Sequence, residues 1–513
     1  MHWADRIAQA LIAREDKAEY VCAAGISPSG SVHIGNFRDI VTSYFVCLAL
    51  RRRGKRARLL FSWDEFDRMR KVPANVAELH EDFAQYIGKP YADVPDPFGC
   101  CGSYAAHFER EFEQALERFG IEVDFRYQAK EYRGGRYMPH ILTAMAKRGE
   151  IFDILDSFRT QDSTPGERES YYPVSIYCPA CGKDETTIES YDEASQTAQY
   201  SCACGHAGVF AFERDFNCKL SWKTDWPMRW MVERVDFEPG GKDHASPTGS
   251  FQTSKIIADK VFGWRPPMFQ GYEFIGIKGA TGKMSGSTGL NLTPEALFKL
   301  YQPEVILWLY AKTDPMKAFN FCFDEEILRQ YFEFDKMLTQ VRAGKAGELA
   351  CDVMAYCTIP GREIKTVPMA QLVSFGSIVE FVPGMLETIF EKIGTPFARE
   401  DFEERIGLAQ YWLFQCSPES IYRLREARDE AYFAALSAQE QDEIHKLYQY
   451  LTQAQYTMDD LQTKLYAIPA DKPSQARFFR NVYQLLLGTE RGPRLYLFLF
   501  ALEREQFIHL LAF

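Results

Sequence analysis

The stretch Pro28–Asn36, PSGSVHIGN, lies between a segment that reads as a strand and one that reads as a helix. The apolar run 20–26, YVCAAGI, precedes it, and apolar residues recur at helical spacing over 34–48. A second strand-like run follows at 57–63, ARLLFSW. This order predicts a βαβ unit of a parallel sheet, in which the quoted stretch is the turn at the carboxyl edge, where ligands bind.

The groups in this turn suit a polyphosphate. Unpaired backbone N–H groups and the helix dipole favour anions at a helix N-terminus. Gly30 and Gly35 let the backbone approach a ligand closely, while His33 and Asn36 add side-chain donors. For the four residues HIGN alone, the alternative is a helix start with an incidental histidine.

Composition limits the class of protein. A chain of 513 residues has room for two to four domains, and 46% hydrophobic with 25% charged residues is typical of a globular protein. The sequence has no apolar run near the ~18 residues of a membrane span, and its start is amphipathic and acidic, unlike a targeting peptide. Thirteen cysteines without a secretion signal favour a reducing compartment. We therefore expect a cytoplasmic protein without a membrane segment.

Four cysteines form two short-spaced pairs, which predict a zinc site: Cys178, Cys181, Cys202 and Cys204. Thiolates at this spacing favour tetrahedral zinc, and a closed site would be structural. The second pair is C-x-C, so His206 could replace one of its cysteines. The alternative is four reduced cysteines without metal. We expect the surrounding polar insert to have little core of its own, so that zinc binding at roughly 10–16 kcal/mol would fold it.

A glycine-rich loop lies about 250 residues after the histidine turn. Residues 278–289 read KGATGKMSGSTG and include Lys283, Met284 and Ser285. Such a loop can close over a triphosphate and add positive charge only when closed, although alone it could be any surface loop.

Together, HIGN and KMSGS resemble the signature of class I aminoacyl-tRNA synthetases. Four further stretches are similar to class I lysyl-tRNA synthetases: SWDEFDRMRKVPANV, PDPFGCCGSYAAHFEREFEQAL, KLSWKTDWPMRW and GGKDH. The likeness runs in order over residues 1–310 and continues more diffusely beyond.

The resemblance implies an activity and its cofactors. ATP, with Mg²⁺, would activate L-lysine to lysyl-adenylate, and the 3′-terminal adenosine of tRNA(Lys) would then accept the lysyl group. The implied catalytic residues are His33, Asn36 and Lys283, with Asn36 in place of the second histidine of the usual HIGH motif. The implied ATP-binding set is Pro28, Gly30, His33, Gly35, Asn36, Lys283, Met284 and Ser285. Zn²⁺ would be structural.

The glycine-rich loop departs from the family at two positions. Most members carry serine at Gly286 and lysine at Thr288, and the general K-M-S-K-S motif has its second lysine where Gly286 stands. Ser285, Ser287 and Thr288 remain as neutral donors, so we expect a working enzyme, with inactivity as the alternative.

The amino acid should lie against the first turn and the elements opposite it. The family places Gly25 and Ser27 there, and a lysine ammonium needs a carboxylate, for which Asp64 and Glu65 are the nearest candidates by topology. For each such residue the alternative is plain packing. The full implied substrate set is Gly25, Ser27, Asp64, Glu65, Trp222, His244 and Tyr272.

The organisation follows from these motifs. We expect an α/β fold with a Rossmann-type parallel-sheet catalytic domain in two halves, 1–95 and 216–340. Residues 96–215 would form a zinc-containing insertion that approaches the acceptor end of tRNA. Residues 341–513, where amphipathic helices dominate, would form an all-α anticodon-binding region. We expect a monomer.

Two other classes stay open. A nucleotidylyltransferase that does not use tRNA would share the histidine turn but should lack the zinc insertion and the helical half. A catalytically inactive RNA-binding regulator would explain the altered loop, but it should also have lost HIGN and GGKDH.

Overall fold

The computed structural model describes residues 1–513 except 160, 279–291, 365, 398 and 454. The glycine-rich loop with Lys283, Met284 and Ser285 thus lies outside the described residues. The chain forms two compact units. Unit 1 comprises Met1–Phe298, Pro303–Phe321 and Gly347–Pro360, and unit 2 comprises Lys299–Gln302, Cys322–Ala346 and Gly361–Phe513.

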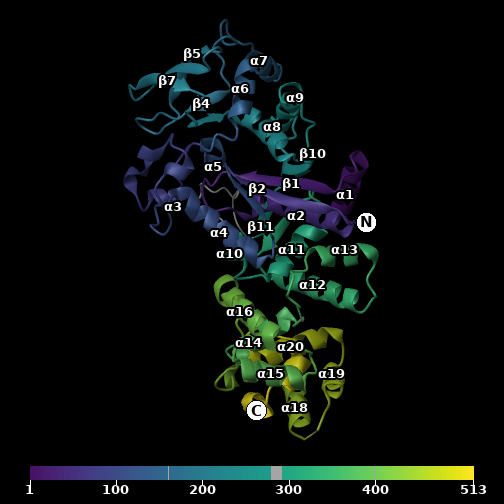
Figure 1. Ribbon diagram of the computed structural model, residues 1–513. Helices are drawn as coiled ribbons and strands as arrows, with labels where there is room; N and C mark the ends of the chain where they lie inside the picture. The colour runs from purple at the N-terminus through teal and green to yellow at the C-terminus, as the bar shows by residue number, and fades with distance from the viewer. Residues whose placement is uncertain (160, 279–291, 365, 398, 454) are drawn as a thin grey trace. The chain divides into compact units, whose positions relative to one another are not determined.

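The centre of unit 1 is a parallel five-stranded sheet (Figure 1). Its strand order is β10 (Met268–Tyr272), β9 (Phe237–Gly241), β1 (Glu19–Ile26), β2 (Arg56–Trp63) and β3 (Asp124–Tyr127). The predicted βαβ unit is confirmed: α2 (Ile34–Arg52) connects β1 to β2, which pair in parallel from Glu19 with Arg56 to Ile26 with Trp63. The predicted Rossmann-type sheet is therefore present.

Helices cover the two faces of this sheet because side chains alternate along each strand. On one face the buried Cys22 of β1 meets Cys47 of α2. On the other face Val21 and Ala23 pack with Trp230 of α8 (Trp222–Glu233) and with α9 (Ser250–Lys260). Near-continuous apolar strands are what such double coverage requires. α1 (Trp3–Arg14) packs on α2.

The range 96–215, expected to be an insertion, contains one strand of the central sheet, β3, so the sheet continues at least to Tyr127. The other elements between β2 and α8 are α3 (Ala74–Ala77), η1 (Glu81–Tyr86), η2 (Tyr91–Asp93), α4 (Tyr104–Arg118), α5 (Gln128–Arg133), α6 (Met138–Ala146), α7 (Arg148–Asp156), β4 (Val174–Ile176), β5 (Thr186–Asp192), β6 (Thr197–Cys202), β7 (Ala207–Ala211) and β8 (Cys218–Leu220). Strands β5, β6 and β7 form an antiparallel sheet, and β4 pairs with β8.

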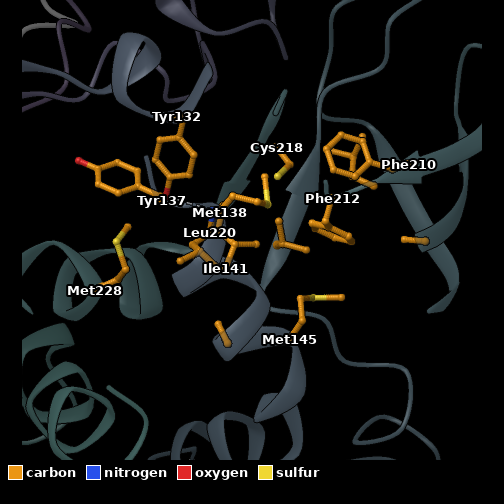
Figure 2. Packing of buried hydrophobic residues seen from close by; sticks show 14 of the residues in the cluster. Tyr132, Tyr137, Met138, Ile141, Met145, Phe210, Phe212, Cys218, Leu220 and Met228 are labelled. Carbon is orange, nitrogen blue, oxygen red and sulfur yellow. Dashed lines mark hydrogen bonds between the residues drawn. The ribbon is translucent and has the colours of Figure 1, made fainter. Parts of the chain in front are cut away.

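The expectation that this region has little core of its own is wrong. Figure 2 shows Met138, Ile141 and Met145 of α6 in one buried hydrophobic cluster with Phe210, Phe212 and Leu220. Met228 of α8 and Tyr132 complete the labelled set together with Tyr137 and Cys218. The sequence of the cysteine-bearing hairpins is polar, but helices on either side of them in the chain supply the missing apolar surface.

The remaining elements of unit 1 are β11 (Ile275–Lys278), α10 (Pro294–Leu297), α11 (Pro303–Lys312) and α13 (Glu348–Tyr356); β11 pairs with β12 (Phe319–Cys322), whose last residue belongs to unit 2. In its described residues, unit 2 is otherwise helical. Its helices are α12 (Glu326–Arg342), α14 (Met369–Ile378), α15 (Pro383–Lys392), α16 (Arg399–Cys416), η3 (Pro418–Ser420), α17 (Glu430–Ala435), α18 (Ala438–Gln453), α19 (Met458–Ala467), α20 (Lys472–Leu487), α21 (Leu495–Ala501), α22 (Arg504–Phe507) and η4 (Ile508–Leu511). Across the part of the chain that the structure describes, no helix has the length and apolarity to cross a membrane.

A buried arginine holds the helices of unit 2 together. Arg405 of α16 is fully buried and donates to both carboxylate oxygens of Asp335 of α12, at 2.7 Å each. It also donates to Gln302 at 2.8 Å and to the carbonyl of Val367 at 2.5 Å. These partners satisfy a charge that would otherwise be costly to bury.

Candidate functional site

A cavity of about 580 Å³ lies at the carboxyl edge of the central sheet. Strand ends of β1, β2, β9 and β10 contribute to its wall, and α8 forms another part of it. Seven residues that the sequence analysis selected line it: Gly25, Ser27, Asn36, Asp64, Trp222, His244 and Tyr272. Glu65 does not line it, and neither do Pro28, Gly30, His33 and Gly35 of the turn.

His33 caps α2. Its Nδ1 accepts the backbone N–H groups of Gly35 at 3.1 Å and Asn36 at 3.3 Å. Because Nδ1 is an acceptor here, the proton of the neutral imidazole lies on Nε2, which remains as a donor. Burial lowers the pKa of His33, which keeps the ring neutral near pH 7. A Cβ at position 35 would lie 2.9 Å from this ring, so the close fold of the imidazole over the turn requires glycine.

The idea that free backbone N–H groups at this helix start would hold a phosphate needs correction. Gly35 and Asn36 donate to His33, Ile34 donates to the carbonyl of Leu292 at 2.9 Å, and Phe37 donates to the carbonyl of His33 at 3.0 Å. The histidine itself uses the donors that a phosphate would otherwise bind. The helix dipole still favours an anion here, and within the described residues neither the Nε2–H of His33 nor the side-chain amide of Asn36 has a protein partner.

The first strand ends in a close approach to the second. A Cβ on Gly25 would lie 2.9 Å from the carbonyl oxygen of Ser62, so only glycine fits beside β2. Ser27 donates to Asp67 at 2.6 Å, and Gly25 N–H donates to Asp39 at 3.3 Å. Pro28 is buried, and Gly30 is half-buried in the turn.

The two carboxylates expected to bind the lysine ammonium already have protein partners. Asp64 accepts from Arg229 at 2.6 Å, with both side chains 7% exposed. Glu65 accepts the backbone N–H groups of Gln128 at 2.9 Å and Ala129 at 2.7 Å at the start of α5. Burial raises the pKa of Glu65 to about 8, against these hydrogen bonds. Neither group is a free partner for a substrate ammonium.

An ion-pair network continues from Asp64 under the cavity. Arg229 also contacts Asp225 at 3.3 Å, and Lys219 pairs with Asp67 and lies 3.9 Å from Asp225. Sequence reasoning missed Lys219 and Arg229 as partners, although both lie in the quoted stretch KLSWKTDWPMRW. Their proximity to Asp64 and Asp67 depends on contacts between residues that lie 165 and 152 positions apart in the chain.

Trp222 and His244 each lie against Trp226 in the cavity wall. Trp222 is 37% exposed and stacks on Trp226 with ring centroids 5.0 Å apart, and the guanidinium of Arg229 lies 5.2 Å from the Trp222 ring. His244 contacts Ser250 through Nδ1 at 2.7 Å and lies edge-on to Trp226. Trp222 therefore offers a flat apolar surface, and Nε2 of His244 is left to meet a ligand.

The four predicted cysteines come together. Their sulfur atoms all lie within 4.8 Å of one another, with Sγ–Sγ distances of 3.8 Å for Cys178 with Cys204 and 3.7 Å for Cys181 with Cys202. Gly182 and Gly205 have φ of 76° and 91°, as tight turns after each pair require. These distances fit four thiolates around one tetrahedral zinc ion. His206 is not part of this cluster of described residues.

A second cluster has the same compactness and was missed from sequence. Asp96, Cys100, Cys101 and His107 bring one ligand atom each to within 4.8 Å of the others. The Cys100 sulfur lies 3.1 Å from Nδ1 of His107 and 3.8 Å from the Cys101 sulfur. Two thiolates, an imidazole and a carboxylate also suit zinc. The signal was the adjacent cysteine pair followed by a histidine within PDPFGCCGSYAAH.

Comparison with known proteins gives a consistent result over the chain. Residues 1–357 match the family described as tRNA synthetases class I (K). The chain is 37% identical to the lysine–tRNA ligase of Thermococcus kodakarensis over 529 aligned residues, covering 98% of each chain. It is 35% identical to the lysine–tRNA ligase of Pyrococcus horikoshii, with 98% of each chain covered. It is also 35% identical to that of Treponema pallidum, with 96% of this chain and 95% of the relative covered.

Proposed function

Because the chain belongs to the class I (K) family of tRNA synthetases, we propose that it is a lysine–tRNA ligase. It activates L-lysine with ATP to give lysyl-adenylate and pyrophosphate, and it transfers the lysyl group to the 3′-terminal adenosine of tRNA(Lys). The observation that carries this proposal is the cavity at the carboxyl edge of the sheet. It is lined by residues from the histidine turn, from KLSWKTDWPMRW and from GGKDH, in a chain similar over 98% of its length to lysine–tRNA ligases.

In the first step, the lysine carboxylate attacks the α-phosphorus of ATP in line, an O–P bond forms and the bond to pyrophosphate breaks. No protein nucleophile is needed, so the protein acts by positioning and by stabilising charge. His33 and Asn36 would donate to the phosphate oxygens from Nε2 and from the side-chain amide. The Mg²⁺ that accompanies ATP would shield phosphate charge. Lys283, with Met284 and Ser285, would meet the leaving pyrophosphate.

Structural zinc is part of the same proposal. The cluster of Cys178, Cys181, Cys202 and Cys204 has four donors and would leave no ligand position for water, so zinc there would be structural. The donor set of the Asp96 cluster supports a second zinc ion. Zinc would thus fix two parts of unit 1: the segment around β6 that carries the four cysteines, and residues 96–107 at the start of α4.

We propose unit 2 as the anticodon-binding region; it differs from the expected range 341–513 by including 299–302 and 322–340 and by lacking 347–360. It exposes several aromatic side chains, on which single-stranded bases could stack: Phe332, Tyr411, Phe414 and Tyr466. Phe332 is the most exposed at 64% and borders a cavity of about 590 Å³ with Lys336, Gln371 and Arg494. The cationic groups could hold phosphate, and the amide could read a base edge.

We also propose that the protein acts as a monomer in the cytoplasm. None of the thirteen cysteines forms a disulfide in the structure, which fits a reducing compartment.

The deciding experiment is ATP–pyrophosphate exchange with each amino acid, with and without tRNA. Of the amino acids tested, only L-lysine should support exchange, and tRNA(Lys) should then be charged with it. Exchange with a different amino acid would contradict the assignment of L-lysine as the substrate. Exchange without any charging of tRNA would instead favour a nucleotidylyltransferase.

A further inference from the structure

Six carboxylates line the cavity, and four of them have cationic partners. These are Asp64 with Arg229 at 2.6 Å, Asp67 with Lys219, Asp184 with Arg68 at 3.2 Å, and Glu233 with Arg136 at 2.7 Å. The other two are Asp39 of α2 and Glu238 of β9. Among the residues that the structure describes, neither forms an ion pair.

Among the described residues, the hydrogen bonds of this pair come from neutral donors, and Arg229 lies near Glu238 without forming an ion pair with it. Glu238 is 9% exposed and accepts from the indole nitrogens of Trp226 at 2.9 Å and Trp230 at 2.6 Å. Asp39 accepts from the N–H of Gly25, and the hydroxyl of Tyr272 faces it. Hydrogen bonds from neutral groups satisfy single lone pairs but do not supply a positive charge.

The absence of a cationic ion-pair partner agrees with the raised pKa of both carboxyl groups. Burial raises the pKa of Glu238 to about 7. Burial also raises the pKa of Asp39 well above its usual range, and the nearby Glu238 raises it further. Two carboxyl groups that repel each other in one cavity are stabilised when cations enter it.

We propose that Asp39 and Glu238 bind the two ammonium groups of L-lysine, Asp39 the α-ammonium and Glu238 the ε-ammonium. This inference rests on the proposed function and names the residues that would select its substrate. The number of unpaired carboxylates in the cavity equals the number of cationic groups on lysine. A neutral side chain in place of lysine would leave Glu238 without an ion-pair partner.

The positions of the two carboxylates decide which ammonium each binds. Asp39 follows Asn36 by three residues, which places both on the same face of α2. The carboxylate of the substrate reacts beside Asn36, and the α-ammonium is attached to the adjacent carbon. Asp39 is therefore the group at the reacting end.

Glu238 lies in an aromatic environment that suits the far end of the side chain. Its two indole partners are stacked obliquely, with ring centroids 4.9 Å apart, and Trp226 in turn stacks on Trp222. Indole faces pack along methylene groups and attract an ammonium by cation–π interaction. Glu238 would complete this site with a full negative charge.

Two fragments of lysine separate the two roles. 6-Aminohexanoate has the terminal amine but no α-amine, and L-norleucine has the α-amine but no terminal amine. Their competitive inhibition constants would be measured against L-lysine in the charging of tRNA(Lys) by the full chain. Glu238→Gln should weaken inhibition by 6-aminohexanoate about 10- to 100-fold, the size of a lost charged hydrogen bond, and leave that of norleucine unchanged. Asp39→Asn should give the reverse pattern.

Two further variants control for misfolding and for general loss of charge. Glu238→Asp keeps the carboxylate and should recover part of the affinity for 6-aminohexanoate. Asp153→Asn removes a carboxylate that is paired with Arg168 and lies outside the cavity, and it should change neither constant. The folded fraction of each variant is measured by circular dichroism, and the inhibition constants are compared only between variants that are folded at the assay temperature.

The outcomes separate this inference from the proposed function. Equal weakening of both fragments by Glu238→Gln, or an unchanged KM for L-lysine in Glu238→Gln and Asp39→Asn, would overturn the assignment. Either of these outcomes refutes only the inference, provided that the unmodified chain charges tRNA(Lys) with lysine. If the unmodified chain does not use lysine at all, the proposed function fails first.

Discussion

His33 and Gly35 are fitted to one another: the Nδ1 atom of the imidazole accepts the N–H of Gly35 at 3.1 Å, and the space over Gly35 that a Cβ would fill is taken by the same ring. The histidine thereby has two tasks. It closes the start of α2, and its Nε2–H is the donor that we propose for a phosphate oxygen. A substitution can remove one task or both.

His33→Ala should remove both. Loss of the cap should cost about 0.5–2 kcal/mol of stability, and loss of the donor should lower adenylate formation by roughly 100-fold or more. His33→Ser is the matched control, because serine caps a helix but cannot reach the phosphate, so it should regain stability and not rate. Thermal unfolding and single-turnover adenylate formation measure the two effects. An equal loss of lysine affinity and rate in His33→Ala would show that the residue only supports the pocket.

The KM for lysine should depend on pH through Glu238, whose pKa burial raises to about 7. Below that pH the free protein carries the neutral acid, and binding an ammonium requires ionisation, so a proton is released and the KM rises as the pH falls, by at most about tenfold per unit. The charged groups near Glu238 are Arg229 and Asp64, together with Asp39 across the cavity. In Glu238→Gln this acid dependence should be reduced. A pH-independent KM between about pH 6 and 8 in the unmodified chain would contradict the expectation.

Metal analysis of the purified chain should find two zinc ions. Cys178→Ser should remove one and destabilise the β5–β7 sheet, and His107→Ala should remove the other. His206→Ala is the control, since the imidazole of His206 lies outside the cysteine cluster, and it should keep both ions. Inductively coupled plasma measurement gives the count, and a full count in Cys178→Ser would exclude the first site.

Asp335→Ala should strongly destabilise unit 2. It would leave Arg405 buried without its counter-charge, which typically costs about 3–5 kcal/mol. The double variant Asp335→Leu with Arg405→Met should be closer to the unmodified stability, because neither charge is then buried alone. Urea unfolding followed by circular dichroism tests this. If the single variant is as stable as the double one, the ion pair contributes little.

Phe332→Ala should weaken the binding of tRNA(Lys) without affecting the amino-acid step. A stacked base contributes about 1–3 kcal/mol, so the KM for tRNA should rise roughly 5- to 100-fold while the KM values for lysine and ATP stay unchanged. Tyr466→Ala, another exposed aromatic of unit 2, shows whether the effect is specific to this surface. An unaltered KM for tRNA in Phe332→Ala would show that Phe332 does not stack on a base of the tRNA.

The sequence predicted those features that depend on neighbours along the chain. The helix over 34–48 and its flanking strands could be recognised because their apolar periodicity is local, and the four zinc-site cysteines because their spacing limits where the sulfur atoms can lie. The partner of Asp64 could not be found in this way, since Arg229 follows 165 residues later and only the fold brings them together. The core around Met138 and Phe212 was missed for a similar reason: its parts come from segments that are well separated along the chain.

The position of β1 in the sheet affects how the protein is made. β1 pairs with β2, which follows soon after, but its other edge pairs with β9, which begins only at Phe237. A ribosome that adds about 5–20 residues per second needs roughly 10–40 s to reach β9 after finishing β1. During that time the growing chain carries an open strand edge and the apolar surface that Trp226 and Trp230 later cover, the features by which nascent proteins aggregate and which chaperones bind. β1, which lies at the centre of the finished site, is thus exposed to aggregation for much of the synthesis of unit 1.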